Sequence, residues 1–248
     1  MEKEKLPSPW QFIKTAAQIY SSKDNFIYLT KVNLAGILVS FIILSPVFIF
    51  GGLSKYFEKG VSALFVIMAA ISLLVSIVAS VVWGLWFKVA LTKAVNFVFN
   101  NQAPAVKETF RFSWVRVWPY ALVSFLFSFA LILGLVLFII PGLILAVWYS
   151  FVVFIIVLEE VDVMEAFGRS KALVKGYFWP VVGRGLAFFV VYLILEIAFA
   201  FIPIAGPLAL VIITPYFMLL PYLLYEELKR LKSENAVLGV SELPPASA

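Results

Sequence analysis

The sequence contains no cysteine and no histidine. Without cysteine, disulfides, thiolate metal sites and cysteine nucleophiles are excluded. Without histidine, the chain lacks the most frequent general base and the most frequent metal ligand. Hydrolytic chemistry would have to rest on carboxylates, lysine or tyrosine, and no nucleophile elbow, P-loop or dinucleotide-binding glycine motif occurs. We therefore expect no catalytic residue, no metal and no cofactor.

Charge is also scarce. Only 13% of the 248 residues are charged and 63% are hydrophobic, whereas soluble domains carry about 25% charged residues. The missing polar surface indicates that much of the protein faces lipid. The first 25 residues have no continuous apolar stretch of the kind that a secretory signal peptide requires, so we expect the first spanning helix to insert the chain. The sequence thus predicts an integral membrane protein.

Six apolar runs predict six membrane-spanning helices in an all-α bundle. They cover residues 32–50, 61–87, 119–140, 143–158, 180–202 and 207–225. The dipeptide Pro141-Gly142 predicts the turn between the third and fourth spans. Pro215 and Pro221 predict kinks that leave carbonyls of the last span without an intrahelical donor. The membrane domain covers 9–232, with a disordered segment at 1–8 and a flexible tail at 233–248.

Two polar segments predict amphipathic helices on the cytoplasmic side, at residues 9–22 and 161–178. The first begins with Ser8, Pro9 and Gln11, which have the spacing of a capping box. Its apolar face predicts either a helix in the headgroup region or one packed on the end of the bundle. In the second, Ser170 is the only polar residue of the apolar arc, and the spacing of Glu165 and Arg169 predicts an ion pair.

The distribution of basic residues predicts the orientation. With the N- and C-termini in the cytoplasm, every lysine and arginine except Lys55 and Lys59 lies on the cytoplasmic side, as the positive-inside rule requires. The net charge of +5 therefore indicates topology and affinity for anionic lipids rather than for nucleic acid. We expect the cytoplasmic membrane of a prokaryote as the location, the lipid bilayer as a partner, and room for a membrane-protein partner.

The order of sequence marks predicts tandem helical-hairpin repeats. Trp-Pro, an apolar run, Ile-Pro, a second apolar run and an acidic pair occur twice in the same order. The marks are Trp118-Pro119, Ile140-Pro141, Glu159-Glu160, Trp179-Pro180, Ile202-Pro203 and Glu226-Glu227. Each unit would be a polar helix followed by two spans, which makes the repeats parallel, and residues 9–99 are a candidate diverged first copy. We expect the acidic pairs to solvate helix ends rather than to perform acid–base chemistry.

A few polar residues inside the spans are candidate site residues. Glu196 is the one acidic residue within a span, and such a group is by default a functional hypothesis; a hydrogen-bonded carboxyl near the outer boundary is the structural alternative. Arg184 begins the same span and either snorkels to the headgroups or binds phosphate. A small-residue ridge favours helix packing over the lining of a polar pathway. The ridge consists of Ser72, Ser76, Ser80 and Gly84.

Several short motifs carry a resemblance to a known family. They are Phe167-Gly168-Arg169-Ser170-Lys171, Leu173, Lys175-Gly176 and Trp179 within 162–184, the Pro141-Gly142 turn, and Tyr225-Glu226-Glu227-Leu228-Lys229. The chain resembles the membrane domain fused to some bacterial glycerophosphoryl diester phosphodiesterases, and its stand-alone relatives of unknown function. The resemblance implies a six-helix integral membrane protein. It does not imply phosphodiesterase activity, which in the fused proteins belongs to a separate soluble barrel with catalytic histidines.

Three functions remain open at this stage. The favoured one is a non-enzymatic module that organises or assists lipid or membrane-protein processes. The alternative is a transporter or lipid-handling permease with a polar cavity near Glu196, the serine ridge and the last span. An intramembrane enzyme has the least support, because the chain lacks catalytic motifs.

Overall fold

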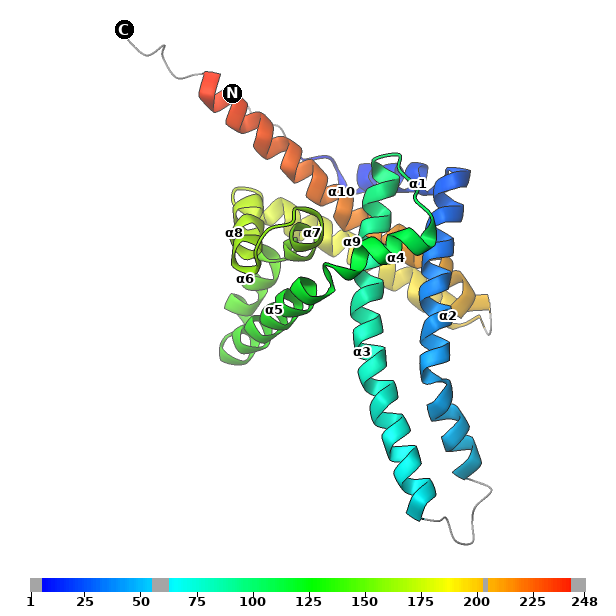
Figure 1. Cartoon of the computed structure of the whole chain (residues 1–248). Helices are drawn as coiled ribbons and strands as arrows, with labels where there is room; N and C mark the ends of the chain where they lie inside the picture. The colour runs from blue at the N-terminus through cyan, green and yellow to red at the C-terminus, as the bar shows by residue number, and fades with distance from the viewer. Residues whose placement is uncertain (1–5, 55–62, 203–204, 242–248) are drawn as a thin grey trace.

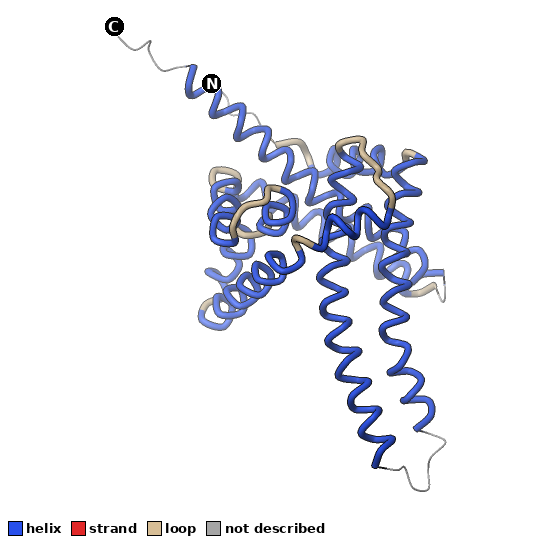
Figure 2. Tube along the Cα trace, in the orientation of Figure 1, coloured by secondary structure: helices blue, strands red, loops and turns tan. Residues whose placement is uncertain are grey.

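The computed structural model describes residues 6–54, 63–202 and 205–241. Within these ranges the fold is all-α, with no strand (Figure 2). Its helices are α1 (Pro9–Ser21), α2 (Lys23–Ser54), α3 (Ala63–Phe99), α4 (Val106–Trp114), α5 (Val117–Leu137), α6 (Ile139–Trp148), α7 (Val152–Leu158), α8 (Val163–Val174), α9 (Phe178–Ala200) and α10 (Ala205–Ser241). Among the described residues, six stretches are long and apolar enough to cross a membrane, as predicted. They are Lys23–Ile49, Phe65–Phe99, Val117–Leu137, Ile139–Leu158, Phe178–Phe199 and Val211–Glu234.

Two spanning helices are much longer than a bilayer requires. Helices α3 and α10 have 37 residues each, or about 55 Å at 1.5 Å per residue. Helix α10 continues to Ser241, where the sequence predicted a flexible tail from residue 233. Residues 1–5 of the predicted disordered segment lie outside the described residues, and so does the loop that carries Lys55 and Lys59. Leu6, which belongs to the same predicted segment, is buried.

The fourth span is broken, and its turn is not where the sequence placed it. The chain reverses at Phe138, which has an extended backbone between α5 and α6. Pro141 instead lies in the first turn of α6, where a missing N–H leaves no hydrogen bond unmade. Gly142 is buried. It packs so closely on α5 that a Cβ atom there would lie 2.7 Å from the Leu135 nitrogen. The glycine therefore permits close helix packing, and the span continues as α7 after a break at Tyr149–Phe151.

Three hairpins, α2–α3, α5–α6 and α9–α10, diverge from a common region (Figure 1). Helices α1, α4 and α8 lie at this region, and each precedes one pair of spans in the chain. The element order therefore matches the predicted unit of a polar helix and two spans, while the repeat itself stays a prediction. The α2–α3 hairpin extends furthest from the other helices. The spans consequently do not close into one bundle along their whole length.

Most buried residues lie in one packed region, here called the hub. The hub consists of residues 89–98 of α3, 151–157 in and before α7, helix α8, and 219–231 of α10. By contrast, only 6% of the most apolar window of α3 is buried, against 44% for α10. The side chains of α3 outside the hub are exposed on nearly all sides of the helix, including Leu74, Val75 and Val78. Such a surface is stable in hydrocarbon and not in water.

Helix α1 packs on the α9–α10 hairpin. Its capping box forms as predicted, since the Ser8 amide donates to Gln11 Oε1 at 2.7 Å and the Gln11 amide donates to Ser8 Oγ at 3.3 Å. Phe12 and Ala16 are buried, and the Phe12 ring meets the Phe188 ring edge-on at 6.1 Å. Of the two positions that the sequence left open for this helix, these contacts support packing on the end of the membrane domain.

Two prolines inside the spanning helices, Pro46 and Pro215, leave carbonyls that side chains bind. Pro215 has no N–H to donate to Val211, and Asn33 Nδ2 of α2 donates to that carbonyl oxygen instead. In α2, Pro46 leaves the carbonyl of Ile42 free, and Ser45 Oγ donates to it at 2.8 Å. The predicted free carbonyl of the last span is thus confirmed at Pro215, and it joins α2 to α10.

Candidate functional site at the hub

Glu159, at the C-terminal end of α7, joins three elements of the hub. Its Oε1 accepts hydrogen bonds from the Tyr225 hydroxyl of α10 and, at 3.2 Å, from Lys229 Nζ. Its Oε2 accepts one from Arg169 Nη1 of α8 at 2.8 Å. The side chain is only 17% exposed. The sequence predicted that this carboxylate would merely solvate a helix end, but it is a partly buried junction.

The surroundings of Glu159 keep it ionised. Burial by itself would raise the pKa of its carboxyl group, but the hydrogen bonds from Tyr225 and Arg169 and the charge of Lys229 outweigh burial and lower the pKa below its usual value. A carboxylate held in this way is a poor proton acceptor or donor near neutral pH. Its geometry suits a fixed anion that orders the hub rather than a general base.

Local sequence explains how α7 and α8 meet at this position. Glu160 has a φ of 56°, so the chain leaves the helical conformation directly after Glu159. Arg169 then reaches back to Glu159 and also binds Glu165 at 2.6 Å, the predicted ion pair. Ser170 is fully buried, and its hydroxyl donates at 2.8 Å to the carbonyl of Trp148, at the break between α6 and α7. Ser170, the one polar residue of the apolar arc, therefore joins α8 to the fourth span at its break.

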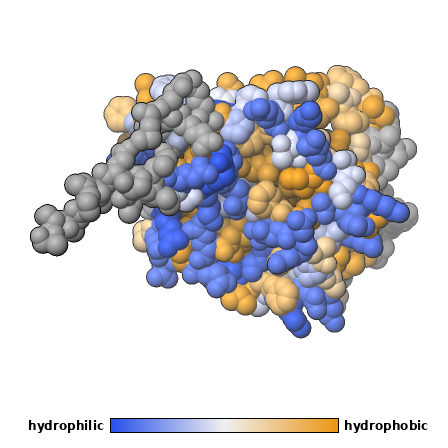
Figure 3. All heavy atoms as spheres, turned by 90° about the horizontal axis from the view of Figure 1, so that it is seen from above, coloured by the Kyte–Doolittle hydropathy of each residue, from blue (hydrophilic) through white to orange (hydrophobic). Residues whose placement is uncertain are grey.

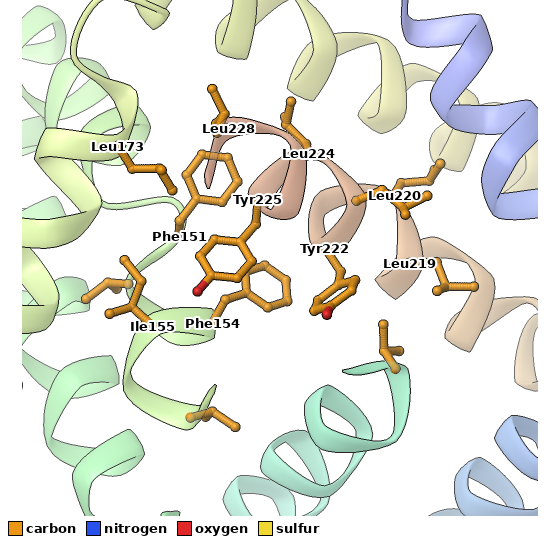
Figure 4. Close-up of a cluster of buried hydrophobic side chains, with 14 of the residues drawn as sticks. Phe151, Phe154, Ile155, Leu173, Leu219, Leu220, Tyr222, Leu224, Tyr225 and Leu228 are labelled. Atoms are coloured by element: carbon orange, nitrogen blue, oxygen red, sulfur yellow. The ribbon is translucent and has the colours of Figure 1, made fainter. Parts of the chain in front are cut away.

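Aromatic rings fill the interior beside Glu159. The ring of Tyr225 lies between those of Phe151 and Phe154 (Figure 4), with centroid separations of 6.2 and 5.5 Å. One turn earlier, Tyr222 is also buried and accepts a hydrogen bond from Asn96 Nδ2 at 2.8 Å. Two tyrosine hydroxyls are thus held inside an otherwise apolar core, each with a polar partner.

Two cavities open at the hub end of the molecule. The smaller is about 240 Å³ and lies between α7, α8 and α10, with Glu159, Arg169, Lys229 and Lys232 in its wall. The larger is about 370 Å³ and lies between α1, the end of α3 and α10. Figure 3 views this end of the protein, where hydrophilic residues surround smaller hydrophobic patches. Both cavities combine charged groups with an apolar floor, as ligand sites do.

Arg184 holds the chain before α1. Its Nε donates to the carbonyl of Pro7 at 2.8 Å, its Nη2 donates to Leu6 at 2.5 Å, and its Nη1 donates to Pro180 of its own helix at 2.9 Å. All three guanidinium nitrogens therefore have backbone acceptors. In the structure Arg184 therefore fixes the chain at the entry to α1, and phosphate binding by this residue stays a prediction.

Glu196 lies near the far end of α9, with a partly exposed side chain that hydrogen bonds to Tyr192. Neither of the two cavities at the hub includes it. Arg184 and Glu196 lie about 18 Å apart along α9, and neither is among the side chains that bind Glu159. Nor do the described residues contain a cluster of three or more carboxylates that would hold a metal ion.

Only part of the predicted serine ridge is buried. Ser76 is buried, and Ser80 Oγ is buried without a hydrogen bond partner in the described part of the chain. Ser72 is only partly buried. A Cβ atom on Gly84 would meet nothing within 4 Å, so this glycine does not mediate close packing.

In the first hairpin, α2 and α3 approach each other closely at Gly36. The sequence analysis did not identify this glycine. A Cβ atom there would lie 2.1 Å from Cε2 of Phe87. Trp83 Nε1 donates to the Gly36 carbonyl at 2.9 Å and to Ser40 Oγ at 3.1 Å. The available signal was a single glycine in an apolar run with a serine four residues later, which is the spacing of a small-residue contact.

The chain matches one family model, which describes a domain of unknown function. The family model of a domain of unknown function, DUF7847, matches residues 91–223, more than half of the chain. The chain belongs to the DUF7847 family. The match begins near the end of α3 and stops within α10, so it contains Glu159, Arg169 and Tyr222. No curated protein and no solved structure matches the chain.

Proposed function

We propose that this DUF7847 protein is a non-enzymatic, lipid-associated module that organises lipids or membrane proteins in the cytoplasmic membrane of a prokaryote. The observation that carries the proposal is the divergence of three apolar hairpins from one small packed hub (Figure 1). Diverging hairpins contact far more lipid per residue than a closed bundle does. That geometry suits a protein that acts on its surrounding lipid or on helices that lie between its hairpins.

The hub supplies the polar end of this module. With the predicted orientation, α1, α4 and α8 lie at the cytoplasmic face, and so do the basic residues Arg169, Lys229 and Lys232. Anionic headgroups are the partners that such a surface attracts, each basic residue near the membrane contributing about 1 kcal/mol. Both termini are cytoplasmic in this proposal.

The suspected relationship to the membrane domain of glycerophosphoryl diester phosphodiesterases fits the same function. Two of the motifs that carry the resemblance, residues 167–171 and 225–229, supply Arg169, Tyr225 and Lys229, which all bind Glu159. The shared residues would therefore preserve the hub and not a catalytic centre. A stand-alone domain of this kind keeps the membrane role without the hydrolase.

A transporter or lipid-handling permease is the second proposal, and Glu196 is the residue that favours it. The pair of Glu196 and Tyr192 places a polar group within a span, which is expensive in lipid unless it has a function. The first proposal is preferred because Glu196 lines neither of the two cavities at the hub.

The experiment that separates the two uses protein extracted directly with its surrounding membrane into polymer-bounded nanodiscs. A lipid-organising module should carry a lipid composition enriched in anionic species relative to the bulk membrane. Arg169→Gln with Lys232→Gln should reduce that enrichment, and Glu196→Gln should leave it unchanged. A composition equal to that of the bulk membrane, together with solute or lipid flux in liposomes that Glu196→Gln abolishes, would replace the first proposal by the second.

A further inference from the structure

The larger cavity at the hub has one apolar side and one polar side. It is lined by Pro7, Gln11, Phe12, Thr15, Phe99, Leu223, Glu226, Glu227 and Arg230. The rings of Phe12 and Phe99 and the side chain of Leu223 supply apolar surface. The charged groups all come from one turn of α10, and at about 370 Å³ the space suits a small ligand.

The charges in this wall do not balance. Glu227 binds Arg230 at 2.7 Å, and Arg230 also binds Glu234 at 2.8 Å. Glu226 receives a hydrogen bond from the Tyr222 hydroxyl at 3.1 Å, and no basic side chain contacts it within the described residues. Among the described residues of the cavity wall, two carboxylates against one guanidinium give a net negative charge, in a chain whose overall charge is +5.

The position of the Glu226 carboxylate is fixed from the protein interior. Asn96 of α3 donates to the Tyr222 hydroxyl at 2.8 Å, and that hydroxyl donates to Glu226 Oε1 at 3.1 Å. Tyr222 is fully buried, and its ring packs edge-on against Phe99 at 5.4 Å. A charged acceptor is therefore held at the edge of an aromatic surface, and its second oxygen has no hydrogen bond donor among the described residues.

We propose that this cavity binds a small alkylammonium group, with Glu226 as its charge partner. An ammonium group supplies the donors that a carboxylate needs. The Phe12 and Phe99 side chains in the wall supply apolar surface for its alkyl chain, and an aromatic ring also attracts a cation placed over its face. An anion is disfavoured because Arg230, the one cation that the described residues place in the wall, is already bound by two carboxylates. The site goes beyond the proposed lipid-organising role, which names no ligand.

Two sources could deliver this chemistry, a free amine from the cytoplasm or the aminoethyl headgroup of a membrane lipid. The test uses the full-length protein in nanodiscs of pure phosphatidylglycerol, to which n-butylammonium is added at pH 7. The expected result is a rise in Tm of about 3 °C at a tenfold excess over the dissociation constant. The isosteric alcohol n-butanol should give no comparable shift, because it lacks the charge.

Variants separate the site from a general effect on the protein. Glu226→Gln keeps an acceptor for Tyr222 and should abolish the shift, whereas Glu165→Gln, outside the cavity, should retain it. Thr15→Phe fills the cavity, leaves Glu226 in place and should also abolish the shift. If Glu226→Gln does not fold, Thr15→Phe decides. An equal shift in the wild type and both cavity variants, or no shift in the wild type, overturns the proposal.

A second arm identifies the source. In nanodiscs that contain phosphatidylethanolamine, the wild type should show a higher Tm and a smaller response to n-butylammonium if the lipid headgroup occupies the cavity. An unchanged response would assign the site to a free amine. Both results support alkylammonium binding, provided that Glu226→Gln removes the effect. A higher Tm that persists in Glu226→Gln contradicts occupation of the cavity by the headgroup.

Discussion

The hydroxyl of Tyr225 donates a hydrogen bond to Glu159, 66 residues earlier in the chain. This contact joins the α9–α10 hairpin to the end of the broken span α6–α7. Arg169 and Lys229 bind the same carboxylate, so one anion holds α7, α8 and α10 together. The packing of the hairpins at the hub depends on this junction, because the hairpins diverge elsewhere.

Removing the tyrosine hydroxyl should loosen the hub. Tyr225→Phe keeps the ring between Phe151 and Phe154 but leaves a partly buried carboxylate with one donor fewer. The expected loss is about 1–3 kcal/mol in the free energy of unfolding, measured by reversible unfolding in bicelles. Tyr149→Phe is the matched control, since its ring packs on Phe167 and should be retained. Equal losses in the two variants would contradict the role of the Glu159 hydrogen bond.

The stability of the hub should depend on pH through Glu159. The folded state has the lower pKa, below the ordinary value of 4.5, so its stabilising contribution is fully present at neutral pH. As pH falls below about 4.5, the unfolded chain takes up a proton first and the contribution declines until pH has passed the folded-state pKa. The difference in Tm between wild type and Glu159→Gln should therefore be constant from pH 7 to 5.5 and shrink below pH 4.5. A difference that does not change with pH would show that Glu159 is not an ionised anchor.

Asn33 and Pro215 should be energetically coupled. Asn33→Leu leaves the Val211 carbonyl without its donor and should cost about 1–3 kcal/mol of unfolding free energy. Pro215→Ala restores a backbone N–H that can bind the same carbonyl. In the Pro215→Ala background, Asn33→Leu should consequently cost clearly less, a coupling of about 1 kcal/mol in a double-mutant cycle. If the cost is the same in both backgrounds, the side chain is not compensating for the proline.

Two helical glycines of the first hairpin should respond oppositely to alanine. Gly36→Ala places a methyl group inside the Phe87 ring and should destabilise the protein by about 1–3 kcal/mol. Gly84→Ala meets open space and should be neutral or stabilising by up to about 1 kcal/mol, because alanine favours the helix. Thermal unfolding of both variants checks this prediction. A destabilising Gly84→Ala would restore the serine–glycine ridge as the packing surface.

The sequence predicted the spans well because hydrophobic length alone requires them. It also indicated Ser170, the only polar residue in an apolar arc, and the carbonyl freed by Pro215. It misplaced the α5–α6 turn, because Pro141-Gly142 has two physical uses: a turn, or a helix start with close packing. It also could not separate Gly36 from Gly84, since only the neighbouring helix decides which glycine meets a side chain.

The Glu159 junction was beyond sequence reasoning for a different reason. Glu159 and Tyr225 are remote in the chain, and nothing in the local pattern distinguishes Glu159 from its exposed neighbour Glu160. The divergence of the hairpins could not be predicted either, because the same apolar residue types occur at positions that face lipid and at positions that face another helix. Three-dimensional placement was needed in both cases.

The divergence itself can be tested on α3, because the chain has no cysteine and each introduced cysteine is unique. Spin labels placed singly at residues 74–78 in liposomes report collisions with oxygen, which dissolves in lipid, and with a water-soluble nickel complex. Labels at Leu74, Val75, Ile77 and Val78, which are exposed, should be open to oxygen and closed to nickel, whereas the label at the buried Ser76 should be protected from both. Protection of Val75 or Val78 equal to that of Ser76 would show that α3 is enclosed by other helices and would contradict the account.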